Sequence, residues 1–347
     1  MFNKPTDTSH VLNKPDTPVT RARRELLTKI GELRGSTAVL FVTSDRDGMS
    51  ARITHDCVDQ FVKHLDGLGD SEKVSLVLHT RGGDTLAGWG IANLIRQYAD
   101  DVEVLVPSRA HSAGTLMGLG ANRLVMTRNA TLGPIDPSVQ GPLNPPIPGA
   151  PPDSTMNVSA EAVNGYVAFA RQVTEGDGMG DVMLDLAKQI HPLVLGDVYR
   201  ARQQIRDLAG RLLIHQIGDA DKTAILDFLC GDSGSHDYSI FRDEARDRLN
   251  LVVEDTDETL TKLLKDLHAN YAGQMKFAEP FLPDAVLGSK QQMTYTCDRV
   301  LVESPAAGAD CYRTAGIISR QTVQGPDGAQ QSRFGNQSLV EGWEHFG

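Results

Sequence analysis

Two strand-like segments that end in turns of small residues restrict the fold of this sequence more than any other feature. The apolar runs at 74–78 and 102–106 have the length and composition of buried strands. The first leads into Thr-Arg-Gly-Gly-Asp at 80–84, and the second into His-Ser-Ala-Gly-Thr at 111–115. A helical pattern follows each turn. We therefore expect two successive strand–turn–helix units whose turns lie at the same edge of one sheet.

The alternation extends over the first 130 residues. The predicted strands are 37–43, 74–78, 102–106 and 123–127, and the predicted helices are 21–33, a segment capped by Thr54, a segment through Ile95, and 116–119. Repeated alternation of this length favours an α/β fold with a mainly parallel sheet and right-handed crossovers. Ligands on such sheets bind at the carboxyl ends of the strands, which is where both small-residue turns fall.

The remainder of the chain has a different composition. A proline-rich loop at 141–158 reads either as a lid over a site or as a linker. Helical patterns follow from Ser159 to about residue 231, then at 239–249 and 256–270, and strand patterns at 299–303 and 316–319. The tail from residue 293 would serve partner recognition or close an exposed sheet edge. We predict a mobile arm at 1–20, a core domain at 21–255 and a C-terminal extension at 256–347.

Composition excludes several classes of function. The net charge of −11 argues against nucleic-acid or anionic-membrane binding, since both favour a basic surface. No apolar run reaches the roughly 18 residues that span a bilayer, and the first 20 residues lack a signal-peptide core. The four cysteines form no C-x-x-C pair, which disfavours a metal site and suits free thiols in a reducing compartment. We expect a cytoplasmic protein.

The two turns together offer the parts of a nucleophilic site. Ser112 supplies a hydroxyl at a predicted helix start, and Ala113 leaves room beside it. The backbone N–H groups of Gly82, Gly83 and Ala113 could hold an oxyanion. A serine at such a turn is also a common helix cap. The turn is not the G-x-S-x-G elbow of α/β-hydrolases, because Ala110 occupies the position of the first glycine.

Several motifs together resemble one known group of proteins. They are the glycine turn, the Ser-Ala-Gly-Thr turn, Leu-Gly-Pro-Ile-Asp-Pro at 132–137, Arg-Arg-Glu-Leu-Leu at 23–27 and Ser-His-Asp-Tyr-Ser-Ile at 235–240. The combination resembles the Clp protease/crotonase superfamily and, within it, the serine dehydrogenase proteinase family, relatives of signal peptide peptidase A. The similarity runs from about residue 21 to 251. It implies a Clp protease/crotonase-like ββα-superhelix core with a helical insertion and a small β-containing C-terminal extension.

The resemblance also implies a reaction, serine-type peptide hydrolysis, with Ser, Asp and His in that chain order. Carried onto this sequence, Ser112 is the nucleophile, Asp136 orients the base and His236 is the base. No metal or organic cofactor is implied. Each assignment has a plain alternative, because Asp136 lies between prolines where an Asx turn is common, and His236 could be a surface histidine. The competing histidines are His111, His191 and His215.

A serine–lysine dyad, as in the signal peptide peptidase branch, is the rival to the triad. Lys188 is the first lysine after Ser112 and lies on a predicted helix at 182–190. A desolvated lysine can act as the base, whereas a lysine on a solvated helix face cannot.

Two further functions remain open at this point. A crotonase-type acyl-CoA enzyme would use the same paired N–H groups on a thioester, and a non-catalytic binding or scaffold protein would use Ser112 structurally. The Ser-Ala-Gly turn and the His-Asp-Tyr motif favour the peptidase. The expected partners are a peptide or protein substrate and further copies of the chain. No G-x-x-x-x-G-K-[ST] motif of an unfolding ATPase is present, so large folded substrates would require a regulatory partner protein.

Overall fold

A nine-stranded mixed sheet forms the centre of the computed structural model, which describes residues 13–347 apart from 68–71, 152, 176, 219–220 and 325–329. Its strands lie in the order β1, β14, β13, β12, β2, β3, β4, β6, β11. Their bounds are β1 Asn13–Lys14, β2 Thr37–Thr43, β3 Lys73–His79, β4 Asp101–Val106, β6 Arg123–Met126, β11 Val253–Asp255, β12 Gln292–Ser304, β13 Gly308–Gln324 and β14 Gln330–Phe346.

The strands from β2 to β11 pair in parallel, as the strand–helix alternation predicts. Alternate residues of each strand face two different cores. On β3, Leu76 and Leu78 belong to one core, whereas Val77 belongs to the other. Burial on both faces explains why these strands read as continuous apolar runs. The prediction of an α/β, Clp/crotonase-like fold with a mainly parallel core sheet is confirmed.

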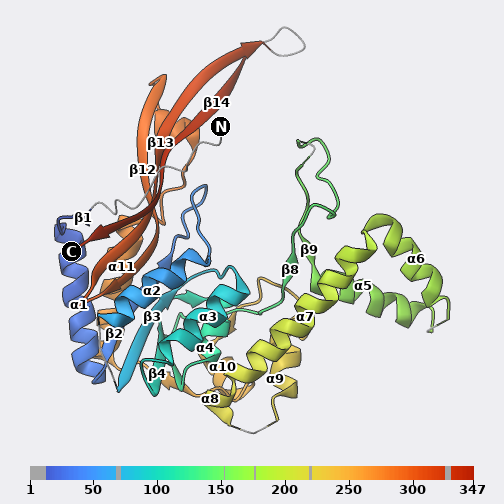
Figure 1. Cartoon of the computed structure of the whole chain (residues 1–347), viewed down its shortest axis with the longest axis horizontal. Coiled ribbons are helices and arrows are strands. Elements are labelled where there is room, and N and C mark those ends of the chain that lie inside the picture. The colour runs from blue at the N-terminus through green and yellow to red at the C-terminus, as the bar shows by residue number, and fades with distance from the viewer. Residues whose placement is uncertain (1–12, 68–71, 152, 176, 219–220, 325–329) are drawn as a thin grey trace, which may run out of the picture.

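Three helices, α2, α3 and α4, cover one face of the parallel strands (Figure 1). Their bounds are α2 Asp56–Asp66, α3 Thr85–Ile95 and α4 Ala113–Leu119. Each contributes buried apolar residues to the larger core, such as Phe61, Ile91 and Leu116. The cap of α2 differs from expectation, since His55 occupies the N-cap and the Thr54 hydroxyl interacts with Asp56 instead.

The opposite face is covered by α1 (Pro18–Arg34) and α11 (Glu258–Gln274). Helix α1 begins before the predicted residue 21 because Pro18 occupies its first turn and Thr17 forms a capping box with Thr20. Upstream, β1 pairs in parallel with β14. Within the predicted mobile arm, residues 13–14 are therefore paired in a strand and residues 18–20 are helical, and residues 1–12 lie outside the described residues.

The C-terminal strands join the core sheet and do not form a separate unit. Strand β12 pairs antiparallel with β2, so that Val300 lies opposite Thr43, and β13 and β14 continue outward. Figure 1 shows this ribbon rising well beyond the helices. The sequence suggests two roles for the tail, partner recognition and closure of a sheet edge. The pairing of β12 with β2 closes the sheet edge at β2. The short helix α12 (Pro283–Leu287) packs against β12 and β13.

Residues 138–249 form the helical insertion. Strands β8 (Ser138–Val139) and β9 (Val158–Ser159) pair antiparallel, so the proline-rich loop is the tip of a hairpin (Figure 1). The helical elements are α5 Ala160–Val173, α6 Met179–Gln189, α7 Pro192–Leu212, α8 Ile214–Ile217, α9 Thr223–Asp227, the π-helix η1 Phe228–Asp232 and α10 Arg242–Asp247. Helices α5 and α6 project away from the sheet (Figure 1). No helix of the described residues is long and apolar enough to cross a membrane.

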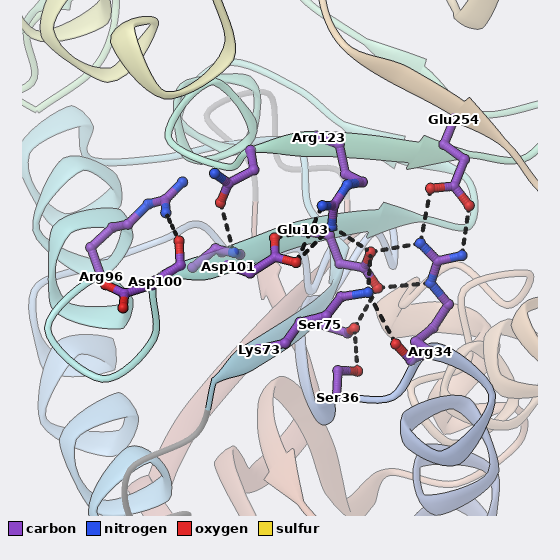
Figure 2. A network of polar contacts seen from close by, with 12 residues as sticks. Arg34, Ser36, Lys73, Ser75, Arg96, Asp100, Asp101, Glu103, Arg123 and Glu254 are labelled. Atoms are coloured by element: carbon purple, nitrogen blue, oxygen red, sulfur yellow. Dashed lines mark hydrogen bonds and ion pairs between the residues drawn. The ribbon is translucent and has the colours of Figure 1, made fainter.

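A buried carboxylate joins several strands near their amino ends. The Glu103 side chain on β4 is fully buried and accepts hydrogen bonds from Arg34 at 2.7 and 2.9 Å and from Ser75 at 2.5 Å (Figure 2). Lys73 lies 3.1 Å away, and Arg34 also binds Glu254 on β11. Burial alone would raise the pKa of Glu103, but these partners lower it from 4.5 to about 2.

This network predicts a specific dependence of stability on pH. The folded-state pKa of Glu103 is below its unfolded value, so its stabilising effect is present above pH 4.5 and is lost as the pH falls toward about 2. We expect Glu103→Gln to lower the free energy of unfolding by about 2–3 kcal/mol at pH 7, and by less at pH 3. Urea unfolding at both pH values measures the difference. Glu25→Gln, an exposed substitution on α1, is the matched control.

Candidate active site

Ser112 has an unusual backbone conformation for a residue with a side chain. Its φ is 53° and its ψ is −116°, and it directly precedes α4. Such values cost about 1–3 kcal/mol and persist only where the surroundings enforce them. The half-buried side chain makes no capping hydrogen bond to the helix. The alternative of a structural N-cap therefore does not account for this serine.

The glycine turn packs directly against Ser112. Gly82 has a φ of 103°, and a Cβ placed on it would lie 2.6 Å from the Ser112 Cβ. Gly83 has a φ of 156°, and a Cβ there would lie 2.3 Å from the backbone of Ile53. Both positions therefore need glycine for space as well as for conformation.

Ile53 holds the glycine turn from its other side. Its N–H donates to the Gly82 carbonyl at 2.9 Å, and its carbonyl accepts from Asp84 N–H at 2.8 Å. Asp84 then caps α3 by accepting from the Ala87 N–H at 2.8 Å. The loop after β2 is thus part of the site, which no pattern in the sequence indicated.

Of the three predicted oxyanion donors, Gly82 is already engaged. Its N–H donates to Thr80 Oγ1 at 2.9 Å, and that hydroxyl also hydrogen-bonds Thr43 Oγ1 at 2.7 Å. In the structure this internal bond occupies the Gly82 N–H group that we predicted as an oxyanion donor. The N–H groups of Gly83 and Ala113 make no hydrogen bond to any part of the chain that the structure describes.

A small three-stranded sheet brings the other candidates to the same place. Its order is β10 (Ile240–Phe241), β7 (Thr131–Leu132), β5 (Arg109–Ala110). Strands β5 and β7 are parallel, and β10 is antiparallel to β7. The carboxyl ends of β5 and β7 therefore meet the amino end of β10. Ser112 follows β5, Asp136 follows β7, and His236 precedes β10.

Asp136 and His236 are directly bonded. Asp136 Oδ1 lies 2.6 Å from His236 Nδ1, and their side chains are 9% and 55% exposed. The hydrogen bond to Asp136, although opposed by partial burial, raises the pKa of His236 above 6.5. A carboxylate bonded to one imidazole nitrogen in this way is the arrangement that a Ser-His-Asp triad requires. Among the described residues, however, the Ser112 hydroxyl forms no hydrogen bond to a histidine.

Thr115 is a site residue to which the sequence analysis gave no role. Its buried hydroxyl lies 2.8 Å from the carbonyl oxygens of Ala110 and Gly133 and accepts from the Gly133 N–H at 3.0 Å. It therefore ties the first turn of α4 to the segment that leads to Asp136. The only available signal was its place in the Ser-Ala-Gly-Thr turn.

The three other candidate histidines, His111, His191 and His215, occupy different environments. His111 Nε2 hydrogen-bonds Thr131 Oγ1 at 2.8 Å, and burial with the nearby Arg109 lowers the pKa of His111 to about 4. His191 caps α7 by accepting from the Leu193 N–H. His215 lies on the short helix α8.

Lys188, the proposed base of a dyad, lies on the projecting helix α6. Its side chain is 71% exposed and forms an ion pair with Asp185 at 2.7 Å. Figure 1 places α6 on the outer part of the helical insertion, away from α4. A lysine that acts as a base needs a desolvated environment, which this exposed and paired side chain lacks. The solvated-face interpretation fits this environment, and the dyad does not.

Across the residues that the structure describes, no group of three or more His, Cys, Asp or Glu side chains could hold a metal ion. The four cysteines are buried and form no disulfide.

Comparison with known sequences gives a family match over the part of the chain that carries Ser112. Residues 17–148 match the family described as ClpP-like SDH-type serine proteinases. Two proteins of Methanocaldococcus jannaschii are similar: uncharacterized protein MJ0137, 24% identical over 67% of this chain and 73% of its own, and uncharacterized protein MJ1495, 25% identical over 54% of each.

Two solved structures are also similar. A variant of the 1510-N membrane-bound stomatin-specific protease is 17% identical, over 60% of this chain and 77% of its own, with a TM-score of 0.32. A variant of ClpP1 from Listeria monocytogenes is 14% identical, over 68% and 98%, with a TM-score of 0.36. Residues 17–148 include Ser112, Gly82, Gly83 and Asp136, so the similarity to ClpP-like SDH-type serine proteinases covers these candidate site residues.

Proposed function

We propose that this chain hydrolyses peptide bonds through an acyl-enzyme on Ser112. His236 accepts the Ser112 proton as the hydroxyl attacks the carbonyl carbon, and returns it to the leaving amine. Asp136 fixes the imidazole and stabilises its protonated form. The N–H groups of Gly83 and Ala113 hold the oxyanion of the tetrahedral intermediate, each contributing about 3 kcal/mol to lowering the barrier. Water, activated by His236, then releases the acyl group.

The convergence of β5, β7 and β10 is the observation that carries this proposal. These three short strands bring together residues that are 24 and 100 positions apart in the chain. The bond from Asp136 to His236 Nδ1 leaves Nε2 as the nitrogen that serves the serine. Ser112 and His236 share no hydrogen bond here, so the mechanism requires their approach when substrate binds. Catalytic hydrogen bonds commonly tighten in this way.

The helical insertion supports a further part of the proposal, that the chain acts as a homo-oligomer. Helices α5 and α6 leave large apolar side chains exposed: Tyr166, Phe169, Val173, Met183 and Leu184. Several large apolar side chains exposed on two helices that contact each other are a feature of protein–protein interfaces. The expected substrates are peptides and flexible protein segments.

Labelling with a fluorophosphonate probe tests the assignment of the nucleophile and the base. We expect a single adduct on Ser112, lost in Ser112→Ala and slowed roughly a thousandfold in His236→Ala, because an unassisted serine hydroxyl is a weak nucleophile. Mass spectrometry locates the adduct, and its time course gives the rate.

Two matched variants accompany that experiment. Ser108→Ala removes a nearby serine, and Lys188→Ala removes the base of the rival dyad. Both should label at the wild-type rate. Labelling that survives His236→Ala but is lost in Lys188→Ala would refute the triad.

The Asp136–His236 bond predicts the pH profile of the same reaction. His236 acts as base only when neutral, and its pKa is raised above 6.5. The labelling rate should therefore fall as the pH decreases through a midpoint above 6.5. Asp136→Asn removes the anion responsible and should shift that midpoint to lower pH while slowing the reaction. A midpoint that is the same in both proteins would show that Asp136 does not act on His236.

Gly82→Ala tests the close packing behind Ser112. The new methyl group would lie 2.6 Å from Ser112 Cβ and 2.8 Å from the His111 carbonyl oxygen. We expect the free energy of unfolding to fall by about 2–4 kcal/mol and labelling of Ser112 to be lost. Gly90→Ala on α3 is the control, because nothing lies within 4 Å of its added Cβ. Urea unfolding and labelling should leave this control close to wild type.

A further inference from the structure

Arg46 is a buried cation without a carboxylate partner. The residue is only 8% exposed and lies in the loop that follows β2. Its Nε donates to the backbone carbonyl of Glu279 at 2.8 Å, and its Nη1 lies 3.2 Å from Cys297 Sγ. Across the described residues, no carboxylate lies within ion-pair distance of it. Buried charges are normally paired, so this exception requires an explanation.

The guanidinium group borders a cavity of about 460 Å³ beside the part of β12 that extends beyond its pairing with β2. The cavity lies between β12 and the segment at 276–286 that leads into α12. Its walls combine polar and apolar groups and include Phe281, whose ring centroid lies 5.3 Å from the Arg46 guanidinium carbon. The other apolar walls come from Val286, Met293 and Tyr295. The volume of this cavity falls in the range of small-molecule sites.

The charges around the cavity leave it positive. Its charged lining residues are Arg46, Lys276 and Glu279, and the last two lie 3.5 Å apart as an ion pair. The Cys297 thiol does not compensate, since burial raises its pKa. One positive charge therefore faces the cavity from a residue that is over nine-tenths buried. The net charge of the chain is −11, so the charge at this cavity is opposite in sign to that of the chain as a whole.

We propose that this cavity is a binding site for a small organic anion that carries a carboxylate or phosphate on an aromatic or aliphatic body. Arg46 pairs with the anionic group through the remaining N–H groups of its fork, and the body packs between Phe281 and Tyr295. None of the lining residues belongs to the Ser112 site, so the proposal stands apart from the peptidase mechanism.

Calorimetric titration of the full chain with four probes tests the proposal. Phenyl phosphate and benzoate supply an anion on an aromatic ring, and comparison of the two identifies the preferred anion. Benzyl alcohol lacks the charge, and inorganic phosphate lacks the ring. We expect saturable binding of at least one aromatic anion, at an affinity about tenfold or more above both incomplete probes.

Three variants locate the binding. Arg46→Met should weaken binding of the aromatic anion about tenfold or more, because it removes the charge but keeps the bulk. Ala285→Trp places a large side chain in the cavity lining without altering a charge, and should abolish binding. Arg200→Met, which alters an arginine that is 81% exposed on α7, should bind as wild type does.

Circular dichroism establishes that each variant is folded. If Arg46→Met does not fold, Ala285→Trp decides the question alone. The proposal is overturned if the wild type binds no aromatic anion, if benzyl alcohol binds equally well, or if Ala285→Trp binds with wild-type affinity.

Discussion

Close contact between three backbone segments, with no side chain between them, is the constraint on which the active site depends. Gly82 lies against Ser112, and Gly83 lies against Ile53, at distances that no Cβ could occupy. The backbone bonds of Ile53 to Gly82 and Asp84 hold the turn from behind. This packing enforces the positive φ of Ser112, which the residue would not adopt alone. It also leaves the N–H groups of Gly83 and Ala113 without partners at a helix start, where donors favour negative charge.

The two ends of the parallel sheet have different roles. Near the amino ends of the strands, Glu103 is satisfied by arginine, lysine and serine partners, which join α1, β3 and β4 (Figure 2). At the carboxyl ends, polar groups are left incompletely satisfied around Ser112. Parallel sheets divide in this way because their loops at the carboxyl edge can change without altering the core. The buried Glu103 network holds the amino ends of the strands, and the strained turn at Ser112 lies at their carboxyl edge.

The sequence predicts the parallel half of the sheet well, because strands buried on both faces leave apolar runs that local reading detects. The runs at 74–78 and 102–106 fall within β3 and β4, and both turns lie at the expected edge. The C-terminal strands could not be placed in the same way. The pairing of β12 with β2 joins residues more than 250 positions apart, and nothing local specifies it. The roles of Ile53 and Arg46 were missed for the same reason, since both depend on distant backbone contacts.

Two-residue strands explain how a histidine so far along the chain comes to bond with Asp136. The main sheet provides no strand that leads to His236, and the family match ends at residue 148, well before it. Strand β10 instead pairs with β7, the strand that leads to Asp136. Because β10 runs antiparallel, the residues before it, and not those after it, reach the active edge. A helix in the insertion, such as the one that carries Lys188, has no comparable pairing to bring it back to Ser112. The direction of a single short strand thus favours the histidine over the lysine as the proposed base.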